Sequence, residues 1–435
     1  MEWYIIFLIA LGGLLLLLFL GYWVPFALGT VGIIGIYLVK DGTSLGALGL
    51  IGWNSINSFE LTAVPLFIFM GEIILRTGIS DKFFENMSIL IRRLPGGLLQ
   101  TNIMSSGFFA AVSGSSTATI AAVGSVAVPE LKKRGYNHSM IYGSLGGGGA
   151  LGYLIPPSTA LIIYGSLVQE SVAKLFLAGI LPGLIAITIF MFFIGIVCYI
   201  KPDMVPHQKS DTSLTLKQFI KSIIGIMPVV IMILMVLGGI YLGLTTPTES
   251  ASLGAVISLF YAVIYRKFTY KNIKHSLVYT VKTTSMVMFI IFGAQILSHF
   301  IVESGINRAL TDWIIELNPS PVLFLTIIVI IYLILGCIMD GLSMIFLTLP
   351  ILFPLIQAMG FDAIWFGIVL VILIEIAQIT PPVGVNLFVL QGISGKGTSL
   401  GKIVKGNIPY FFLYLLLLII VMVFPKFVLW LPSTM

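Results

Sequence analysis

The chain has 435 residues, of which 58% are hydrophobic and only 9% are charged, and its mean hydropathy is +1.10. A soluble domain is about half apolar and about a quarter charged, so this composition excludes a soluble enzyme and predicts a polytopic membrane protein. The net charge of +6 is therefore not interpreted as a nucleic-acid-binding surface. Cys198 and Cys337 both lie in apolar segments, which gives no indication of a disulfide.

Several apolar segments have the length of a membrane-spanning helix, which needs about 20 residues. We predict such spans at residues 3–21, 24–40, 61–77, 174–199, 221–244, 250–266, 283–301 and 406–430. The first span follows Glu2 rather than a basic segment and has no small-residue cleavage site, so we interpret it as a retained helix and not a signal peptide. Residues 43–58 and 271–282 are amphipathic, and we expect them to lie flat at the membrane interface.

Two longer apolar stretches, 99–134 and 321–359, are interrupted by small polar residues. The interruption is Ser113-Gly114-Ser115-Ser116-Thr117 in the first and Asp340-Gly341-Leu342-Ser343 in the second. Each stretch has the length of two short helices, which predicts two re-entrant helical hairpins with these polar residues at their tips.

Two other apolar stretches, 139–169 and 362–393, contain proline pairs in the middle, at Pro156-Pro157 and Pro381-Pro382. Adjacent prolines remove two backbone donors and clash with the preceding turn, so each helix must break there. Broken backbone at membrane depth is tolerated only where it is buried in protein or lines a cavity. The two Pro-broken helices therefore indicate functional segments.

These features repeat at one spacing. Adding 225 to a residue number relates Pro129 to Pro354, Gly135 to Gly360, Tyr136 to Phe361, Pro156 to Pro381, and Pro157 to Pro382. The same shift relates Ser115 to Asp340 and Ser116 to Gly341 at the hairpin tips. We infer an internal duplication, 1–199 and 219–435, joined by a polar linker at 201–217. The alternative, that a shared proline pair arose by chance, does not account for several matches at one spacing.

The positive charges predict how the repeats are oriented. If 99–134 is a hairpin with its base inside the cell, then of the 23 lysines and arginines 19 fall inside, and the rest outside are Lys40, Lys174, Arg308 and Lys426. Positive charges accumulate on the cytoplasmic side of membrane proteins, so the split favours this arrangement. The base of the second hairpin then lies outside, which makes the repeats inverted and places both termini outside.

Inverted repeats with broken helices near the membrane midplane are typical of secondary transporters. We expect the first hairpin tip to meet the break at Ile155-Pro156-Pro157-Ser158-Thr159, and the second tip to meet Thr380-Pro381-Pro382-Val383-Gly384. Hydroxyls and freed carbonyls are hard oxygen ligands suited to sodium. The alternative is that serine and glycine here only permit close helix packing, which we favour for Gly146 to Gly149.

Three acidic residues need separate interpretation. Asp340, at a hairpin tip, either faces a cation site or reaches water, since a carboxylate at the membrane centre usually has a partner. Glu375 lies within an apolar segment and either serves the site or pairs with a cation of a neighbouring subunit. Glu72 has Arg76 four residues later, which we interpret as a pair on a helix surface.

The sequence gives no indication of an enzyme or an ATPase. Residues 395–398, Gly-Lys-Gly-Thr, lack the spacing of a Walker A loop, and no zincin helix or nucleophile elbow occurs. The four histidines are scattered along the chain and suggest no metal or catalytic cluster. An ion gradient or a partner protein must therefore supply the energy, without an organic cofactor.

Four segments resemble the large membrane subunit of tripartite ATP-independent periplasmic (TRAP) transporters: Ser113 to Thr119, Pro129 to Tyr136, Leu154 to Ser158, and Thr245 to Ala251. The resemblance covers essentially the whole chain. It implies a sodium-coupled importer of organic acids in the bacterial inner membrane, and the charge distribution above then places both termini in the periplasm. It also implies two partners, a small four-helix membrane subunit and a periplasmic substrate-binding protein, the former expected as a separate polypeptide.

The resemblance also implies an elevator fold, in which a transport domain moves against a scaffold. Carried over to this chain, the expected divisions are 1–98 (scaffold), 99–169 (first half of the transport domain), 170–320 (scaffold, linker and second amphipathic arm), 321–393 (second half of the transport domain) and 394–435 (final scaffold helix). The implied sodium ligands are Ser115, Ser116, Thr117, Ile155, Asp340, Gly341, Thr380 and Gly384.

Expected substrate contacts are Ser158, Thr159 and Asn386, and the expected substrate is sialic acid or a C4-dicarboxylate, with a preference for sialic acid. The alternative function is a stand-alone ion-coupled anion symporter that uses no binding protein.

Overall fold

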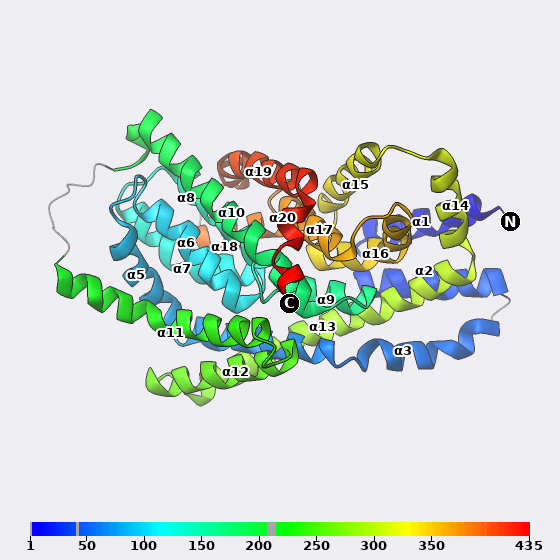
Figure 1. The fold of residues 1–435 in the computed structure, drawn as a ribbon, viewed down its shortest axis with the longest axis horizontal. Helices are drawn as coiled ribbons and strands as arrows, with labels where there is room; N and C mark the ends of the chain where they lie inside the picture. The colour runs from blue at the N-terminus through cyan, green and yellow to red at the C-terminus, as the bar shows by residue number, and fades with distance from the viewer. Residues whose placement is uncertain (1, 41–42, 207–214, 396) are drawn as a thin grey trace.

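The computed structural model describes residues 2–40, 43–206, 215–395 and 397–435. Throughout these ranges the regular elements are helices, and no strand occurs among them. Part of the linker, 207–214, and two of the counted cations, Lys209 and Lys396, lie outside the described residues. Figure 1 shows α11, α12, α13 and α3 along one long edge of the molecule, with the hairpins and broken helices above them.

The chain order confirms an all-helical membrane fold. The first repeat contains α1 (Trp3–Phe19), α2 (Val24–Lys40), α3 (Leu48–Ile56), α4 (Ala63–Arg76), α5 (Ile79–Ile91), α6 (Leu98–Ser113), α7 (Ser116–Lys133), α8 (His138–Gly149), α9 (Thr159–Val168) and α10 (Val172–Ile200). The second contains α11 (Leu216–Tyr241), α12 (Pro247–Ile264), α13 (Tyr270–Glu303), α14 (Ile306–Leu317), α15 (Pro321–Gly336), α16 (Gly341–Ala358), α17 (Ala363–Gln378), α18 (Val385–Ser394), α19 (Leu400–Val423) and α20 (Pro425–Leu429).

The duplication is visible in the helix boundaries. The second helices of the two hairpins, α7 and α16, begin and end 225 residues apart, and so do the first residues of α8 and α17. Both hairpins turn where small polar residues cap the second helix: Ser115 accepts a hydrogen bond from the Ala118 amide, and Asp340 accepts one from the Ser343 amide. Serine and aspartate are strong N-cap residues, so the sequence dictates these turns locally.

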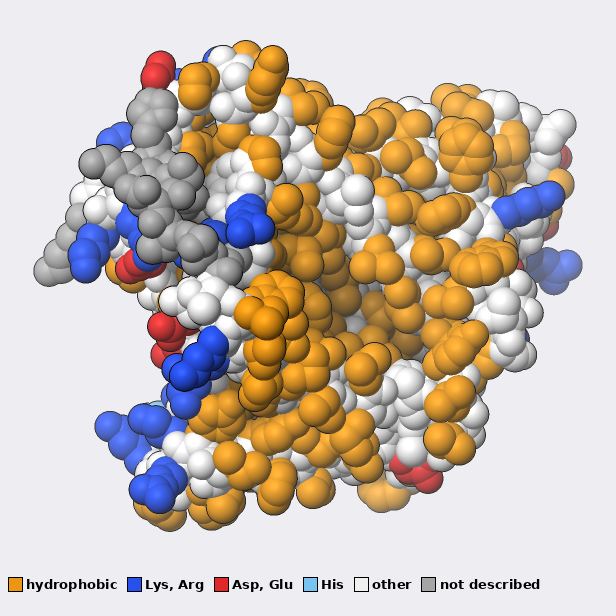
Figure 2. Space-filling model, turned by 60° about the vertical axis from the view of Figure 1, so that its left-hand side comes forward, with side chains coloured by type: hydrophobic (Ala, Val, Ile, Leu, Met, Phe, Trp, Pro, Cys, Tyr) orange, Lys and Arg blue, Asp and Glu red, His pale blue; other side chains and the backbone are white. Residues whose placement is uncertain are grey.

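Much of the surface is suited to lipid. In the described part of the chain, six helices are long and apolar enough to cross a membrane, namely α10, α11, α12, α13, α16 and α19. Figure 2 shows a broad apolar face, on which most of the visible lysine and arginine side chains gather toward one edge. This distribution is what a one-sided placement of cations in a multi-pass membrane protein produces.

One predicted helix boundary is wrong. Residues 271–282 do not form a separate segment, because they are continuous with the following span in the 34-residue helix α13. The corresponding part of the first repeat is divided into α3 and α4, with Asn57, Ser58 and Phe59 between α3 and a short 3₁₀ turn. Ser58 donates to the Glu60 carboxylate at 2.6 Å, and such local side-chain bonds compete with a helix. No proline or asparagine-serine cluster interrupts α13.

Two helices were not predicted. α5 and α14 each lie directly before a hairpin, at equivalent places in the two repeats. α5 packs against α6, α7 and α11, while α14 packs against α16, α13 and α1. Each therefore connects a hairpin to helices outside it.

The helices form two groups that meet at the hairpins. In the first group, α2 packs along α13, and α4 packs along α12. In the second, α19 packs along α8 and also contacts α17 and α18, while α10 contacts α6, α9 and α17. α4 and α13 of the first group contact the hairpin helices α6 and α16, so the groups share an interface at the hairpins.

The glycine tract in α8 provides close packing against α19, as expected, since a Cβ atom at Gly147 would lie 2.1 Å from the ring of Tyr410. At Gly143, one turn before the tract, a Cβ atom would lie 2.3 Å from the Gly406 carbonyl oxygen and 2.9 Å from the ring of Tyr410. Neither backbone can yield, so we expect Gly143→Ala to destabilise the protein by about 1–3 kcal/mol, as overpacking does. Thermal unfolding in detergent checks this. The control is Gly195→Ala on α10, where the added methyl meets nothing within 4 Å, and equal melting of both variants would contradict the prediction.

Candidate functional site

Both hairpin tips open into one cavity of about 210 Å³. Its lining includes Ser113, Ser115 and Thr117 from the first tip and Asp340, Gly341 and Leu342 from the second. The opposite wall comes from α4 and α13, through Gly71, Glu72, Tyr279 and Thr283 among others. The cavity therefore lies at the interface between the hairpins and the first group of helices.

The first hairpin tip meets the first helix break. Gly114, at the turn, has a positive φ of 60°, which favours glycine, and its carbonyl accepts from the Thr159 amide at 3.2 Å and the Thr159 hydroxyl at 2.8 Å. Ser115 and Thr117 hydroxyls lie 3.1 Å apart. The tip thus presents adjacent hydroxyl oxygens to the cavity while its backbone is fixed to the start of α9.

The second hairpin tip meets the second break in a similar way. The Cys337 thiol donates to the Pro381 carbonyl at 3.4 Å, and a Cβ atom at Gly341 would lie 2.3 Å from the Ile374 side chain. Asp340 is half-buried, caps α16 through the Ser343 amide at 3.3 Å, and also accepts from the Ser343 hydroxyl. Its carboxyl group lies on the cavity wall.

The structure brings together only part of the expected site. Ser115, Thr117, Thr159, Asp340 and Gly341 line the cavity. The other expected ligands are not among the lining residues: Ser116, Ile155, Ser158, Thr380, Gly384 and Asn386.

Four of these residues make local contacts or are enclosed by protein. Ser158 caps α9, and the Thr380 hydroxyl donates to the Ile376 carbonyl at 2.6 Å. The Gly384 amide donates to the Thr380 carbonyl at 3.0 Å, which closes the second turn on itself. Asn386 is fully buried, and its amide atoms have no hydrogen-bond partner in the structure.

The two breaks differ in exposure. Pro156-Pro157 and Pro381-Pro382 are both cis peptide bonds, but the first pair is buried and the second is exposed. Irregular backbone cannot face lipid tails, so the second break must contact water or protein in the membrane.

Sequence reasoning missed several cavity residues. Glu72 was expected on a helix surface, yet it is buried, lines the cavity and is held by Arg76 at 2.9 Å. Tyr153 and Gln378, each two residues before the start of a break, also line the cavity. Their nearness to the proline pairs is the signal that could have identified them.

Glu375 is fully buried inside the chain. The alternative that it pairs with a cation on a neighbouring subunit is therefore wrong, because no part of it reaches the surface. The Ser116 hydroxyl contacts both carboxylate oxygens, at 2.7 and 2.8 Å, and the Tyr153 amide donates to one of them at 2.6 Å. Glu375 thus joins the first hairpin tip to the first break from a helix of the second repeat.

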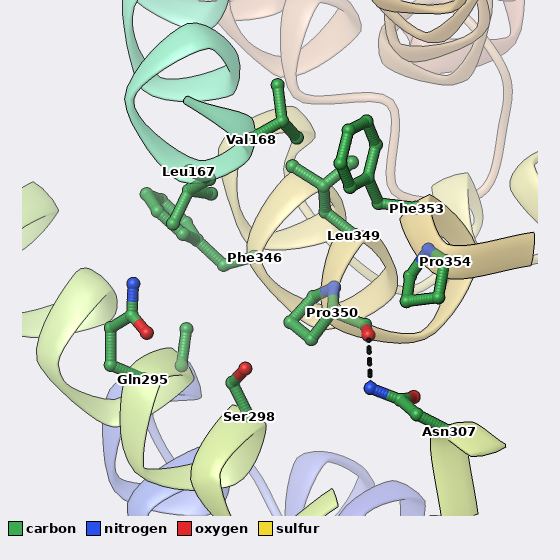
Figure 3. A pocket seen from close by; sticks show the side chains of 11 residues that line it. Leu167, Val168, Gln295, Ser298, Asn307, Phe346, Leu349, Pro350, Phe353 and Pro354 are labelled. Carbon is green, nitrogen blue, oxygen red and sulfur yellow. Dashed lines mark hydrogen bonds between the residues drawn. The ribbon is translucent and has the colours of Figure 1, made fainter. Parts of the chain in front are cut away.

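A second cavity, also about 210 Å³, lies between the end of α9, α13, α14 and α16. Figure 3 shows apolar side chains such as Phe346 and Leu349 on one side and Gln295, Ser298 and Asn307 on the other. The Asn307 side-chain amide donates to the Pro350 carbonyl at 3.3 Å. Pro354, four residues later, has no N–H, so this carbonyl lacks its usual partner within the helix. Neither hairpin tip lines this cavity, so the first cavity is the better candidate site.

The distribution of metal-binding side chains in the described residues indicates no further site. Within the described ranges, no group of three or more histidine, cysteine, aspartate or glutamate residues is placed to hold a metal ion. The side-chain oxygens that line the first cavity are mostly hydroxyls, with carboxylates from Asp340 and Glu72. Such ligands suit a hard monovalent cation.

Residues 11–427 match the family described as tripartite ATP-independent periplasmic transporter, DctM component. The chain belongs to this family. It is a multi-pass transporter subunit and not an enzyme. The family name also describes a system of three components.

Relatives and solved structures agree with this assignment. The C4-dicarboxylate TRAP transporter large permease protein DctM of Pseudomonas aeruginosa is 34% identical over 410 residues, covering 94% of each chain. The sialic acid TRAP transporter large permease protein SiaM of Vibrio cholerae is 29% identical over 423 residues, covering 97% of each. The crystal structure of the Alcanivorax borkumensis YdaH transporter has a TM-score of 0.61 at 14% identity and covers 90% of each chain, which shows a shared fold alone.

Proposed function

We propose that this chain is the large membrane subunit of a sodium-coupled TRAP importer of an organic acid. The observation that carries the proposal is the chemistry of the first cavity, which places hydroxyls from one hairpin tip and a carboxylate from the other on a single wall. No lysine, arginine or histidine is among the residues that line it. An organic anion entering such a cavity needs cations to accompany it, and hard oxygen ligands favour sodium.

The membrane potential gives the same requirement. Moving one charge across 100 mV involves about 2.3 kcal/mol, so a carboxylate enters an inside-negative cell against the potential. One sodium ion neutralises a monoanion, whereas two let the potential drive import. The duplicated tips offer two related cation sites, formed by Ser115 and Thr117 in one repeat and Asp340 in the other.

The substrate class is an organic acid of the C4-dicarboxylate or sialic acid type. The relatives named above carry these two substrates in their names, and both cover nearly the whole chain. Of the three substrate contacts expected from the sequence, Thr159 lines the cavity. Hydroxyls and helix termini at the breaks supply recognition there, as is typical of transporters with broken helices.

We further propose an elevator mechanism in the bacterial inner membrane, with both termini periplasmic. The cavity has one wall on the hairpins and breaks and the other on α4 and α13, so relative movement of these walls would change the side from which the site is reached. The divisions expected from the sequence place α10 and α19 in the scaffold. Because both helices pack against the hairpins and broken helices, we propose instead that they move with them. A small four-helix membrane subunit and a periplasmic substrate-binding protein complete the system.

Proteoliposomes containing the chain and its two partner proteins test this function. Radiolabelled C4-dicarboxylates and sialic acid are offered with an inward sodium gradient, and with choline in place of sodium as the control. We expect uptake of one class that stops when sodium or the binding protein is omitted. Uptake that persists in choline contradicts sodium coupling, and uptake that persists without the binding protein favours a stand-alone anion symporter.

A further inference from the structure

Glu375 is a buried carboxylate whose hydrogen-bond partners are both uncharged. It lies on α17 with no exposed surface, bonded to the Ser116 hydroxyl and the Tyr153 amide. A carboxylate withdrawn from water without a positive charge nearby is costly, and either protonation or a nearby cation removes that cost. Glu375 is therefore suited to lie close to a cation when the protein is loaded.

The position of Glu375 points to the first hairpin tip as the place of that cation. Ser116 lies between the cavity-lining residues Ser115 and Thr117, and Tyr153 also lines the cavity. A Cβ atom at Gly152 would lie 2.4 Å from the backbone of Ser115 and Ser116. The tip and the break are thus in direct backbone contact, with the carboxylate beside them.

Comparison of the two repeats shows what Glu375 adds. Ser115 and Asp340 occupy equivalent positions, and both cap the second helix of their hairpin. Only the second tip therefore carries a charge of its own. The residue equivalent to Glu375 in the first repeat is Ala150, so the acid is not itself duplicated.

We propose that Glu375 is a positioning residue that supplies negative charge to a cation site at the first hairpin tip, from the opposite repeat and through Ser116. The proposal rests on the sodium coupling proposed above and assigns one carboxylate to each tip. It differs from a purely structural role, in which Glu375 only joins the tip to the break by hydrogen bonds.

The variant Glu375→Gln separates these roles, because glutamine keeps the shape and an acceptor oxygen but removes the charge. We expect the half-saturating sodium concentration for uptake to rise about tenfold or more, with little loss of rate at saturating sodium. Sodium-dependent thermal stabilisation of the purified protein should shift to higher concentrations by the same factor. An unchanged sodium dependence, or an equal loss of rate at every sodium concentration, would overturn the proposal.

A rescue experiment sharpens the test. In the Glu375→Gln background, Ser115→Asp places a carboxylate where the second repeat has Asp340, and aspartate also serves as an N-cap. We expect this second change to restore most of the sodium affinity. If Glu375 only joins the tip to the break by hydrogen bonds, the second change should not restore it.

If Glu375→Gln does not reach the membrane, Ser116→Ala replaces it in the test. We then expect weaker sodium affinity, and an unaltered affinity would overturn the proposal. Sodium-independent uptake by the unmodified protein would instead show that the proposed function fails.

Discussion

Oxidation of a Gly71→Cys/Ser113→Cys pair is expected to abolish transport completely, and reduction is expected to restore it. Gly71 lies on α4 and Ser113 at the end of α6, on opposite walls of the first cavity. A Cβ atom at Gly71 would lie 3.4 Å from the Ser113 Cβ atom, close to the separation of about 3.5–4.5 Å that a disulfide needs. If the hairpin moves past α4 during each cycle, this bond holds it in one state.

The measurement is sodium-driven uptake before and after oxidation, in a background where Cys198 and Cys337 are replaced. The matched control is Gly239→Cys/Thr245→Cys, since a Cβ atom at Gly239 would lie 3.8 Å from the Thr245 Cβ atom and both positions lie outside the proposed moving part, at the end of α11 and in the turn after it. Cross-linking the control should leave transport largely intact. Full activity in the oxidised Gly71/Ser113 pair would contradict an elevator movement between these walls.

The positions of hairpins and breaks could be predicted because local chemistry determines them. Proline pairs at Pro156-Pro157 and Pro381-Pro382 end a helix wherever they occur. The small polar residues before α7 and α16 cap those helices through their own side chains. The spacing of 225 residues followed directly from these features, and the structure reproduces it in the helix boundaries.

The cavity could not be predicted in the same way, because its walls come from distant parts of the chain. Ser116 and Glu375 are 259 residues apart in sequence, and no local pattern indicates their contact. Glu72 and Arg76 have the spacing of an ordinary surface pair, and only the packing of α4 against α6, α12 and α13 reveals that Glu72 is buried. Continuity of α13 was missed because its polar first part resembles an interfacial segment.

Replacement of Asp340 by asparagine is expected to reduce sodium-driven uptake at least about 100-fold, since a unit charge 4 Å from a cation contributes about 4 kcal/mol at an effective dielectric constant of about 20. Asparagine caps helices as well as aspartate does, so α16 and the second tip should keep their structure. The loss therefore reports the charge on the cavity wall rather than the fold of the hairpin.

The measurement is the initial rate of uptake over a range of sodium concentrations, with thermal stability recorded for each variant. Asp312→Asn on α14 is the matched control, because Asp312 is an exposed carboxylate that does not line the cavity, and its removal should leave sodium dependence unchanged. An Asp340→Asn protein with normal sodium affinity would contradict a cation site at the second tip. Asp340 lines the cavity directly, whereas Glu375 lies behind its wall. We therefore expect Asp340→Asn to reduce sodium-driven uptake more than Glu375→Gln does. A larger effect of Glu375→Gln would place the principal cation site at the first tip.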